Sequence, residues 1–446
     1  MDYKQKYLKY KQKYLKMLRD QKGGEPFLSD ILALPAYPRL IIMNKKQLKH
    51  FISQRLMNRL FTGRQLKLIP LGMISLNAHN RLKLIAQSSL GVVLARKFAN
   101  FQNPELLIRI IERMSRPRIS EPTCVATLEG HSGWVTSVAF HATEPLMATG
   151  SVDKTAKVWR LVDTADGAAA SCVATLARHS SAVLSVAFHP SLPLLATGSH
   201  DNTVKLWRLV DTEDGTAATC VATLAGHSSW VTSVAFHATE PLLATGSLDN
   251  TAKLWRMSLD GASATCVATL AGHRWAVRSV DLHASKPLLA TGSWDNTAKL
   301  WRISPDCTEA TCVATLDRRN GGHKNTVNSV AFHATEPLLA TGSGDNTAKV
   351  WRLSEDGTAA TCVATLEGDG HKNTVSSVAF HATEPLLATG SWDGTAKVWR
   401  LSENGSAATC VATLVGHRDR VSSVAFHPRE HILATSSDDG TAKLWK

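Results

Sequence analysis

A histidine and a tryptophan recur seven times along the chain, always 28 residues apart, and this spacing constrains the fold more than any other feature. The histidines are His131, His179, His227, His273, His323, His371 and His417, and the tryptophans are Trp159, Trp207, Trp255, Trp301, Trp351, Trp399 and Trp445. Successive histidines lie 48, 48, 46, 50, 48 and 46 residues apart, so every insertion falls outside the 28-residue block. We therefore expect each block to be one rigid structural unit.

Short runs of alternating apolar and polar residues within each unit predict β-strands. The first unit holds such runs at residues 135–140, 146–151, 155–159 and 172–176. The connections between them are rich in Gly, Asp, Asn and Pro, the residues that favour turns. Each unit is thus predicted to contain four short antiparallel strands and no helix.

Seven such units, with a Gly-His pair near the start and a Trp near the end, resemble the WD40 β-propeller family. The pair is present in six units and is replaced by Arg178-His179 in the second. An aspartate also precedes each Trp by six residues, at Asp153, Asp201, Asp249, Asp295, Asp345, Asp393 and Asp439. The resemblance implies an all-β, seven-bladed propeller over residues 123–446.

The resemblance also implies that in each blade the His, Asp and Trp join a Ser or Thr of the second strand in a buried hydrogen-bonded tetrad. The tetrad positions singled out are His131, Asp153, Trp159, His227, Asp249, Trp255, His273, Asp295, Trp301, His371, Asp393 and Trp399. In the first unit Thr149 and Ser151 lie on the same face of the strand, so its period does not choose between them. The Asp that follows Trp in the family is replaced by Arg in six units and by Lys446 in the last, outside the tetrad.

Closure of the ring is also predicted. The sequence ends one residue after Trp445, at the end of a third strand, whereas an extra copy of the fourth strand, residues 123–128, precedes the first unit. We expect this N-terminal strand to complete the seventh blade, so that no long strand edge remains open and the propeller is monomeric.

The cysteines and histidines follow the repeat. Seven of the eight cysteines occupy one repeated position, Cys124, Cys172, Cys220, Cys266, Cys312, Cys362 and Cys410. They lie one blade apart without Cys-x-x-Cys spacing, so we expect buried, reduced thiols and no zinc site, with Cys307 unassigned in a loop. Fourteen of the 18 histidines repeat as well, whereas a catalytic base should occur once. No Gly-x-Ser-x-Gly, His-Glu-x-x-His or phosphate-loop motif occurs, so no enzyme, cofactor or metal is predicted.

Positions that vary between near-identical units indicate the functional surface. Two places vary most, the second and third residues after the repeated histidine and the residue before the turn aspartate. The resemblance places both at one end of the propeller, the top face. All five tryptophans outside the tetrad fall there, and tryptophan is enriched in binding hot spots. We predict that a protein or peptide binds through Trp134, Trp230, Leu248, Trp275, Trp294, Trp392 and Arg420. The alternative is that each tryptophan packs on its neighbouring loop.

The N-terminal quarter is strongly basic. Residues 1–122 hold 24 Lys and Arg against 7 Asp and Glu, a net charge of +17, although the whole chain carries +13. Residues 1–24 contain the heptad Tyr-Lys-Gln-Lys-Tyr-Leu-Lys twice in succession. On a helix this repeat would form a basic amphipathic leader with a coiled-coil stripe. The doublet resembles the start of many giant DNA virus proteins. We expect it to dock on a second partner, RNA or an anionic surface, with a frayed tail as the alternative.

Residues 25–122 read as a mainly helical region and linker. Residues 28–32 weakly resemble the opening of an F-box, which would imply a ubiquitin-ligase substrate adaptor, and the +17 charge would suit an RNA- or nucleic-acid-associated factor. Both remain alternatives to an interaction scaffold. No stretch of 18 apolar residues and no secretory signal occurs, so we expect an intracellular protein, cytoplasmic or nuclear, of the host cell if viral.

Overall fold

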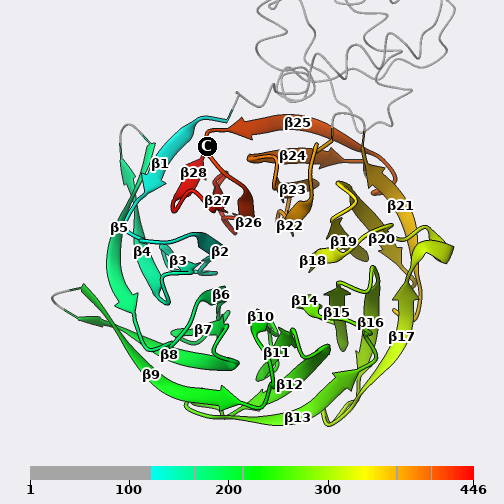
Figure 1. The fold of residues 1–446 in the computed structure, drawn as a ribbon, viewed down its shortest axis with the longest axis horizontal. Helices are drawn as coiled ribbons and strands as arrows, with labels where there is room; N and C mark the ends of the chain where they lie inside the picture. Colours follow the sequence, from blue (N-terminus) through cyan, green and yellow to red (C-terminus); the bar gives the residue numbers. More distant parts are fainter. Residues whose placement is uncertain (1–121, 165–166, 213–214, 368–369, 403) are drawn as a thin grey trace, which may run out of the picture. The chain divides into compact units, whose positions relative to one another are not determined.

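The computed structural model describes residues 122–446 except 165–166, 213–214, 368–369 and 403. Within these residues, 28 strands form seven four-stranded antiparallel sheets around a central opening, with one short 3₁₀ helix, η2 (Arg318–Asn320), before blade 5 (Figure 1). This confirms the predicted seven-bladed propeller. The leader at residues 1–24 and the F-box-like segment lie outside the described residues.

Within each of blades 1 to 6 the strands follow in chain order from the inner strand, which lines the opening, to the outer strand (Figure 1). Blade 1 contains β2 (Val135–Phe140), β3 (Leu146–Ser151), β4 (Ala156–Thr164) and β5 (Gly167–Leu176). Blade 2 contains β6 (Val183–Phe188), β7 (Leu194–Ser199), β8 (Thr203–Thr212) and β9 (Gly215–Ala225). Blade 3 contains β10 (Val231–Phe236), β11 (Leu242–Ser247), β12 (Thr251–Met257) and β13 (Ala264–Ala271). Blade 4 contains β14 (Val277–Leu282), β15 (Leu288–Ser293), β16 (Ala298–Ile303) and β17 (Ala310–Leu316).

The remaining blades follow the same order. Blade 5 contains β18 (Val327–Phe332), β19 (Leu338–Ser343), β20 (Ala348–Leu353) and β21 (Ala360–Leu366). Blade 6 contains β22 (Val375–Phe380), β23 (Leu386–Ser391), β24 (Thr395–Leu401) and β25 (Ala408–Val415). Blade 7 contains β26 (Val421–Phe426), β27 (Leu433–Ser437), β28 (Ala442–Trp445) and, from the other end of the propeller sequence, β1 (Cys124–Leu128).

The ring closes as predicted. Strand β1 pairs antiparallel with β28, with Cys124 opposite Trp445 and Leu128 opposite Ala442. The backbone N–H of Thr123 donates to the carbonyl of Lys446 at 3.0 Å, and the N–H of Lys446 donates back at 3.1 Å. Blade 7 therefore holds the first and last strands of the propeller in one sheet, which leaves the outer edge of β28 paired.

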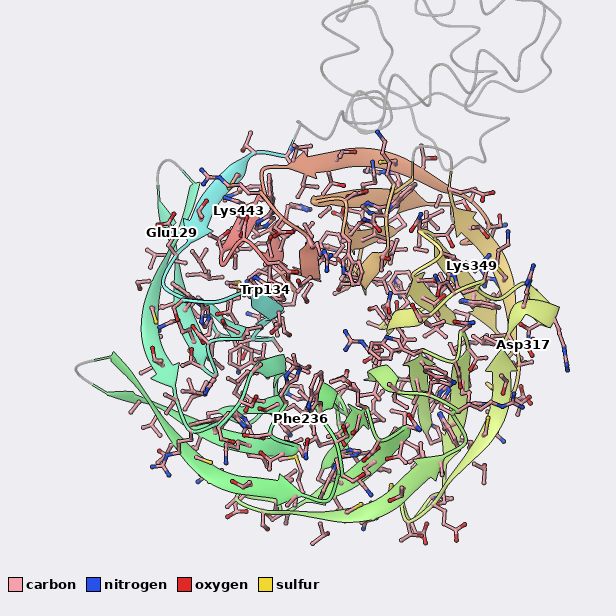
Figure 2. The ribbon with its side chains drawn as sticks, in the orientation of Figure 1. Glu129, Trp134, Phe236, Asp317, Lys349 and Lys443 are labelled. Carbon is pink, nitrogen blue, oxygen red and sulfur yellow. The ribbon has the colours of Figure 1, made fainter. Side chains whose placement is uncertain are left out.

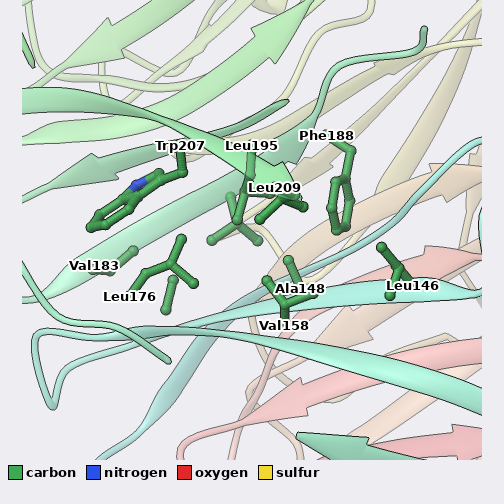
Figure 3. Packing of buried hydrophobic residues seen from close by; sticks show 11 residues of the cluster. Leu146, Ala148, Val158, Leu176, Val183, Phe188, Leu195, Trp207 and Leu209 are labelled. Carbon is green, nitrogen blue, oxygen red and sulfur yellow. The ribbon is translucent and has the colours of Figure 1, made fainter. Parts of the chain in front are cut away.

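The core is a ring of clusters between neighbouring blades rather than one central core. Figure 3 shows Leu146 and Val158 of blade 1 with Val183, Leu195 and Trp207 of blade 2 in one such cluster. The second strand of each blade, such as β3, is buried along its whole length, which explains its apolar and small residues. A Cβ on Gly342 would stand 2.8 Å from a methyl of Val375 in the next blade, so glycine permits this close approach.

A second set of seven histidines stabilises the turns between the first and second strands of the blades. The Nδ1 of His141 accepts backbone N–H groups from Thr143 at 3.2 Å and Glu144 at 2.9 Å, and its ring meets Phe188 of the next blade edge-on, with centroids 5.1 Å apart. The other six residues, His189, His237, His283, His333, His381 and His427, accept the equivalent pair of N–H groups. These side chains replace backbone partners in the turns between the first and second strands.

The arginine that takes the place of the family's Asp after Trp joins neighbouring blades. The guanidinium of Arg208 donates at 2.5 Å to the carbonyl of Asp260, in the loop between the third and fourth strands of the next blade. Arg256, Arg302 and Arg352 donate to Asp306, Asp356 and Asn404 in the same way. The sequence placed this residue outside the tetrad but did not reveal this contact.

The prediction that the repeated cysteines are buried was wrong. Four of them, Cys124, Cys172, Cys266 and Cys312, are exposed, and Cys220, Cys362 and Cys410 are half-buried, as is Cys307. All seven repeated cysteines lie on the outermost strand, where no further strand covers them. In blade 1 a β-bulge separates the pairs Val158–Ala174 and Trp159–Cys172, so the alternation of buried and exposed faces breaks next to the cysteine. All eight thiols are free.

Candidate interaction face

A chain of hydrogen bonds links four side chains in every blade. In blade 1 the indole N–H of Trp159 donates to Thr149 Oγ1 at 2.8 Å, His131 Nε2 lies 2.8 Å from the same oxygen, and His131 Nδ1 lies 2.8 Å from Asp153 Oδ2. The same distances are between 2.7 and 2.9 Å in the other six blades. The structure thus brings together all of the predicted tetrad residues.

The threonine, not the serine, occupies the fourth position. Ser151 instead donates to the carbonyl of Gly133 at 3.2 Å and accepts the N–H of Asp153 at 3.1 Å. The equivalent threonines are Thr197, Thr245, Thr291, Thr341, Thr389 and Thr435. Thr149 and Ser151 lie on the same face of β3, but only Thr149, two residues before the end of the strand, lies within hydrogen-bond distance of the indole N–H.

Proton positions in the tetrad follow from the donors. Because an ionised aspartate can only accept, the N–H of the neutral imidazole lies on Nδ1, so Nε2 accepts the threonine hydroxyl, and the threonine oxygen accepts the indole N–H. Burial lowers the pKa of His131, His179 and His417, so the neutral ring is favoured. Burial alone would raise the pKa of Asp153, but hydrogen bonds from Thr155 and His131 outweigh it and bring that pKa to about 2.

The tetrad aspartates have no free acceptor sites for a ligand. In blade 1, Asp153 Oδ1 accepts the N–H and hydroxyl of Thr155 at 2.9 and 2.6 Å, and Oδ2 accepts His131 and the N–H of Ser132. Within residues 122–446, leaving out the undescribed gaps, no group of three or more His, Cys, Asp or Glu side chains is placed to hold a metal ion. The same residues include no helix that is long and apolar enough to cross a membrane.

The two variable positions of each blade meet at one end of the propeller. The N–H of Leu248 donates to the carbonyl of Trp230 at 2.9 Å, and in blade 4 the N–H of Trp294 donates to the carbonyl of Ala276 at 3.0 Å. The same backbone bond joins the corresponding residues in the other five blades. In every blade the first strand begins and the second strand ends here, so these loops form one face around the opening, which we call the top face.

The five tryptophans outside the tetrad are all exposed on the top face. Their exposed fractions are 55% for Trp134, 42% for Trp230, 63% for Trp275, 38% for Trp294 and 42% for Trp392, whereas no tetrad tryptophan exceeds 4%. Figure 2 shows Trp134 beside the central opening. Exposed indoles in this number are unusual for a surface without a partner.

Three of these tryptophans are held by neighbouring side chains. The ring of His200 in blade 2 stacks on Trp230 of blade 3, with centroids 3.6 Å apart. The guanidinium of Arg420 in blade 7 lies 4.4 Å from the ring centroid of Trp392 in blade 6, and that of Arg278 lies 5.3 Å from Trp294. Leu248 is half-buried beside Trp230. Packing on neighbours and exposure to solvent therefore coexist at Trp230, Trp294 and Trp392.

Sequence reasoning missed Arg278 and Asp281 on the inner strand of blade 4. Asp281 stands where the other six blades have alanine, and its Oδ2 accepts the N–H of Phe332 in blade 5 at 2.7 Å. Burial raises the pKa of Asp281 to about 7. Comparing the seven first strands position by position would have revealed both residues.

A ring of seven four-stranded blades, each with the same tetrad, defines a β-propeller built from repeats. Comparison with known families agrees, because the family model described as "WD domain, G-beta repeat" matches residues 122–160, 170–208, 218–256, 264–302, 310–352, 360–400 and 408–446, more than half of the chain. The chain belongs to the WD40 family. WD40 propellers are typically scaffolds that bind proteins or peptides, and they are usually not enzymes.

One curated relative shares a short stretch with this chain. Over 69 residues it is 39% identical to Protein pleiotropic regulatory locus 1 of Arabidopsis thaliana. The matched stretch covers 15% of this chain and 14% of that protein. The chain thus spans only a small part of that relative's length.

Proposed function

We propose that the propeller is an interaction scaffold that binds a protein or peptide on its top face. Trp230, Leu248, Trp275 and Trp294 of blades 3 and 4 would form the centre of the contact, and Trp134, Trp392 and Arg420 would extend it around the rim. The observation that carries the proposal is that all five non-tetrad tryptophans are exposed at one end. Nothing in the folding of a blade requires them, because each is absent from the equivalent position of several other blades.

The stacked neighbours support this proposal. A side chain that is already held in place loses little conformational entropy when a partner covers it, which strengthens binding for the same buried area. His200 holds Trp230 in this way, and Arg420 holds Trp392. Large, fixed indoles with one accessible face are the kind of residue that dominates binding energy in interfaces.

The proposal is tested with the full-length chain immobilised in an extract, comparing the proteins recovered by the parent and by four variants. Trp275→Ala and Trp294→Ala should each weaken the partner by about 2 kcal/mol, roughly thirtyfold, and deplete it from the recovered set. The controls Glu240→Ala and Glu336→Ala change exposed residues at the opposite end, in the turns between first and second strands. If the glutamate variants lose the partner while the tryptophan variants keep it, the binding face has been placed at the wrong end.

We further propose that residues 1–122 localise the protein or recruit a second partner through their net charge of +17. If that partner is RNA, its retention by the full-length chain should fall steeply with salt, because each neutralised phosphate releases a counterion. If ubiquitin-ligase subunits are retained instead, the F-box-like reading of residues 28–32 gains support. Retention of neither would contradict a recruiting role.

A further inference from the structure

We infer that the partner segment is acidic, and that a carboxylate of an extended peptide binds Arg278 at the mouth of the central opening while an apolar side chain of the same peptide packs on Trp294. The inference rests on the proposed top-face function and names the chemistry of the ligand. It starts from blade 4, where Arg278 and Asp281 depart from the repeat on the inner strand.

Arg278 occupies a position that has another role in most of the blades. It is the second residue of β14, at a β-bulge between Val277 and Ser279, and therefore lies at the top end of an inner strand. At the equivalent position Thr136, Thr232, Asn328 and Ser376 each donate a hydrogen bond to a backbone carbonyl of the next blade. Arg278 makes no such bond, so blade 4 lacks this hydrogen bond to the next blade.

The guanidinium of Arg278 has no acid beside it. Within the described part of the chain it has neither a hydrogen-bond acceptor nor an ion-pair partner, and its Nε is buried without an acceptor. Arg278 is half-buried, so its guanidinium stays partly accessible, whereas its buried Nε has lost water without gaining an acceptor, which is costly. A carboxylate would supply the missing acceptor, because its two oxygens match the fork of N–H donors on a guanidinium.

Aromatic groups flank Arg278. Its guanidinium lies 5.3 Å from the ring centroid of Trp294, which is 38% exposed. The ring of His200 stacks on Trp230, and burial lowers the pKa of this histidine. The positive charge of Arg278 lowers the pKa of His200 further, so Arg278 also acts on the His200–Trp230 pair of blades 2 and 3. A ligand that reaches Arg278 therefore meets indole surface on the way.

The charge of the top face favours an acidic ligand over blades 4 to 7. The residue after the tetrad histidine is serine in blades 1 to 3 but basic in the next four, and all seven are exposed: Ser132, Ser180, Ser228, Arg274, Lys324, Lys372 and Arg418. In the two top-face loops of blade 4, residues 271–276 and 294–297, the one acid is Asp295, whose Oδ2 accepts His273 and the N–H of Arg274.

A short acidic peptide fits this distribution better than a nucleic acid does. The run of basic residues ends at blade 7, which also carries the acids Asp419 and Asp438. Toward blade 1, Glu129, Asp438 and Trp134 line a groove of about 480 Å³. A phosphate backbone carries a negative charge at every nucleotide, so these acids would repel it. A peptide with one or two carboxylates and an apolar anchor needs only Arg278, Trp294 and their basic neighbours.

The test is a selection from a display library of random short peptides on the full-length chain, with counter-selection on Arg278→Gln. Peptides that depend on Arg278 should be enriched in Asp and Glu next to an apolar or aromatic residue. Counter-selection removes peptides that bind the basic residues 1–122. The best peptide is then synthesised, and its dissociation constant is measured with the parent, Arg278→Gln, Arg278→Lys and the exposed cation Arg429→Gln at the opposite end.

We expect Arg278→Gln to weaken the peptide at least about tenfold, Arg278→Lys to weaken it less, and Arg429→Gln to change it by less than about twofold. Replacing the peptide's acids by amides should have the effect of Arg278→Gln, and added NaCl should weaken binding. Equal melting temperatures of the variants exclude unfolding as the cause.

The inference is overturned if the selected peptides lack acids, if Arg278→Gln binds as well as the parent, or if a single-stranded oligonucleotide competes more strongly than the peptide. A phosphoserine peptide that binds more tightly than its glutamate counterpart would assign the site to phosphate instead. If peptides lose binding with Trp275→Ala but tolerate loss of their acids, the top-face function stands and only the acidic ligand fails. If no selected peptide depends on any top-face residue, both fail.

Discussion

One threonine hydroxyl per blade joins the inner and outer parts of the sheet. It accepts the indole N–H from the third strand and donates to the histidine that precedes the first strand, so two buried polar groups depend on a single oxygen. In blade 4 this residue is Thr291, which is fully buried. The tetrad aspartate then fixes the histidine and the turn after the second strand.

Removing this hydroxyl should destabilise the propeller. Thr291→Val keeps the shape of the side chain but leaves Trp301 and His273 without their partner, and we expect a loss of about 1–3 kcal/mol in the free energy of unfolding. Asp295→Ala should act in the same direction. Thr291→Ser, which keeps the hydroxyl, is the matched control and should retain most of the stability. Melting curves that do not distinguish Thr291→Val from Thr291→Ser would show that the hydrogen-bond chain contributes nothing.

The residue scale also shows what the sequence leaves open. The spacing of His131, Asp153 and Trp159 was visible in the repeat, but Thr149 and Ser151 share one face of β3, and only their depth along the strand decides which one reaches the indole. Arg278 was missed, although a comparison of the first strands would have shown it as a departure from the repeat. Its lack of a partner would not have been visible, because that depends on groups from other strands and blades.

At the scale of the element, each turn between first and second strands is built on a histidine that must stay neutral at Nδ1. His237 Nδ1 accepts the N–H groups of Thr239 and Glu240 at 3.2 and 3.0 Å. Burial lowers the pKa of six of these seven residues, His141, His189, His237, His283, His333 and His381. Protonation would replace an acceptor with a donor that faces two further donors.

The propeller should therefore lose stability in mild acid. Because the folded pKa values lie below the unfolded value of about 6.5, the unfolded chain binds more protons below that pH. The contribution of these histidines is fully present above about pH 6.5 and is lost as pH falls through the lowered folded values. The tetrad aspartates act in a separate, lower window, since Asp153 and Asp439 have pKa values of about 2 and their contribution declines only below about pH 4.

Urea unfolding at pH 7.5, 6.5 and 5.5 measures this effect. We expect the urea midpoint and the free energy of unfolding to fall as the pH falls. The uptake of one proton on unfolding lowers this free energy by about 1.4 kcal/mol per pH unit, and we expect a larger decrease because several histidines take up protons. His237→Asn keeps an acceptor oxygen for the turn but does not titrate, so it should reduce the slope. A midpoint that is unchanged between pH 7.5 and 5.5 contradicts the assignment of neutral histidines.

The elements also mark a limit of sequence reasoning. The alternation of residues predicted the four strands of each blade, and the extra copy of the fourth strand predicted how the seventh blade is completed. The repeated cysteines were misplaced because the bulge opposite Trp159 shifts the alternation by one residue, and a bulge leaves no signature in the spacing of one strand alone. The bridge from Arg208 to the next blade was also hidden, since it joins residues 52 positions apart.

At the scale of the whole molecule, closure of the ring depends on β1. A chain that begins at Glu129 lacks this strand and exposes the outer edge of β28, which should lower the melting temperature and promote association through the free edge, compared with a chain that begins at Pro117. Light scattering after size-exclusion chromatography and thermal melting measure both effects. Equal melting and a monomeric state for the two chains would refute the role of β1 in closure.

The fold of the propeller could be predicted from the sequence because seven copies of one pattern reinforce each other, and the first and last strands had only one sheet to complete. The partner could not be predicted in the same way. A repeat reports what the blades share, whereas recognition depends on the residues that differ, such as Trp275 and Arg278, and on their arrangement across blades.

Oxidative footprinting of the full-length chain with and without its bound partner tests the central claim most directly. Trp275 is 63% exposed on the top face, Trp294 is 38% exposed beside it, and Leu259 of blade 3 is 91% exposed at the opposite end, in a loop between third and fourth strands. The account predicts that the partner protects Trp275 and Trp294 from hydroxyl radicals and leaves the oxidation of Leu259 unchanged. Protection of Leu259 with full reactivity of both tryptophans would contradict it.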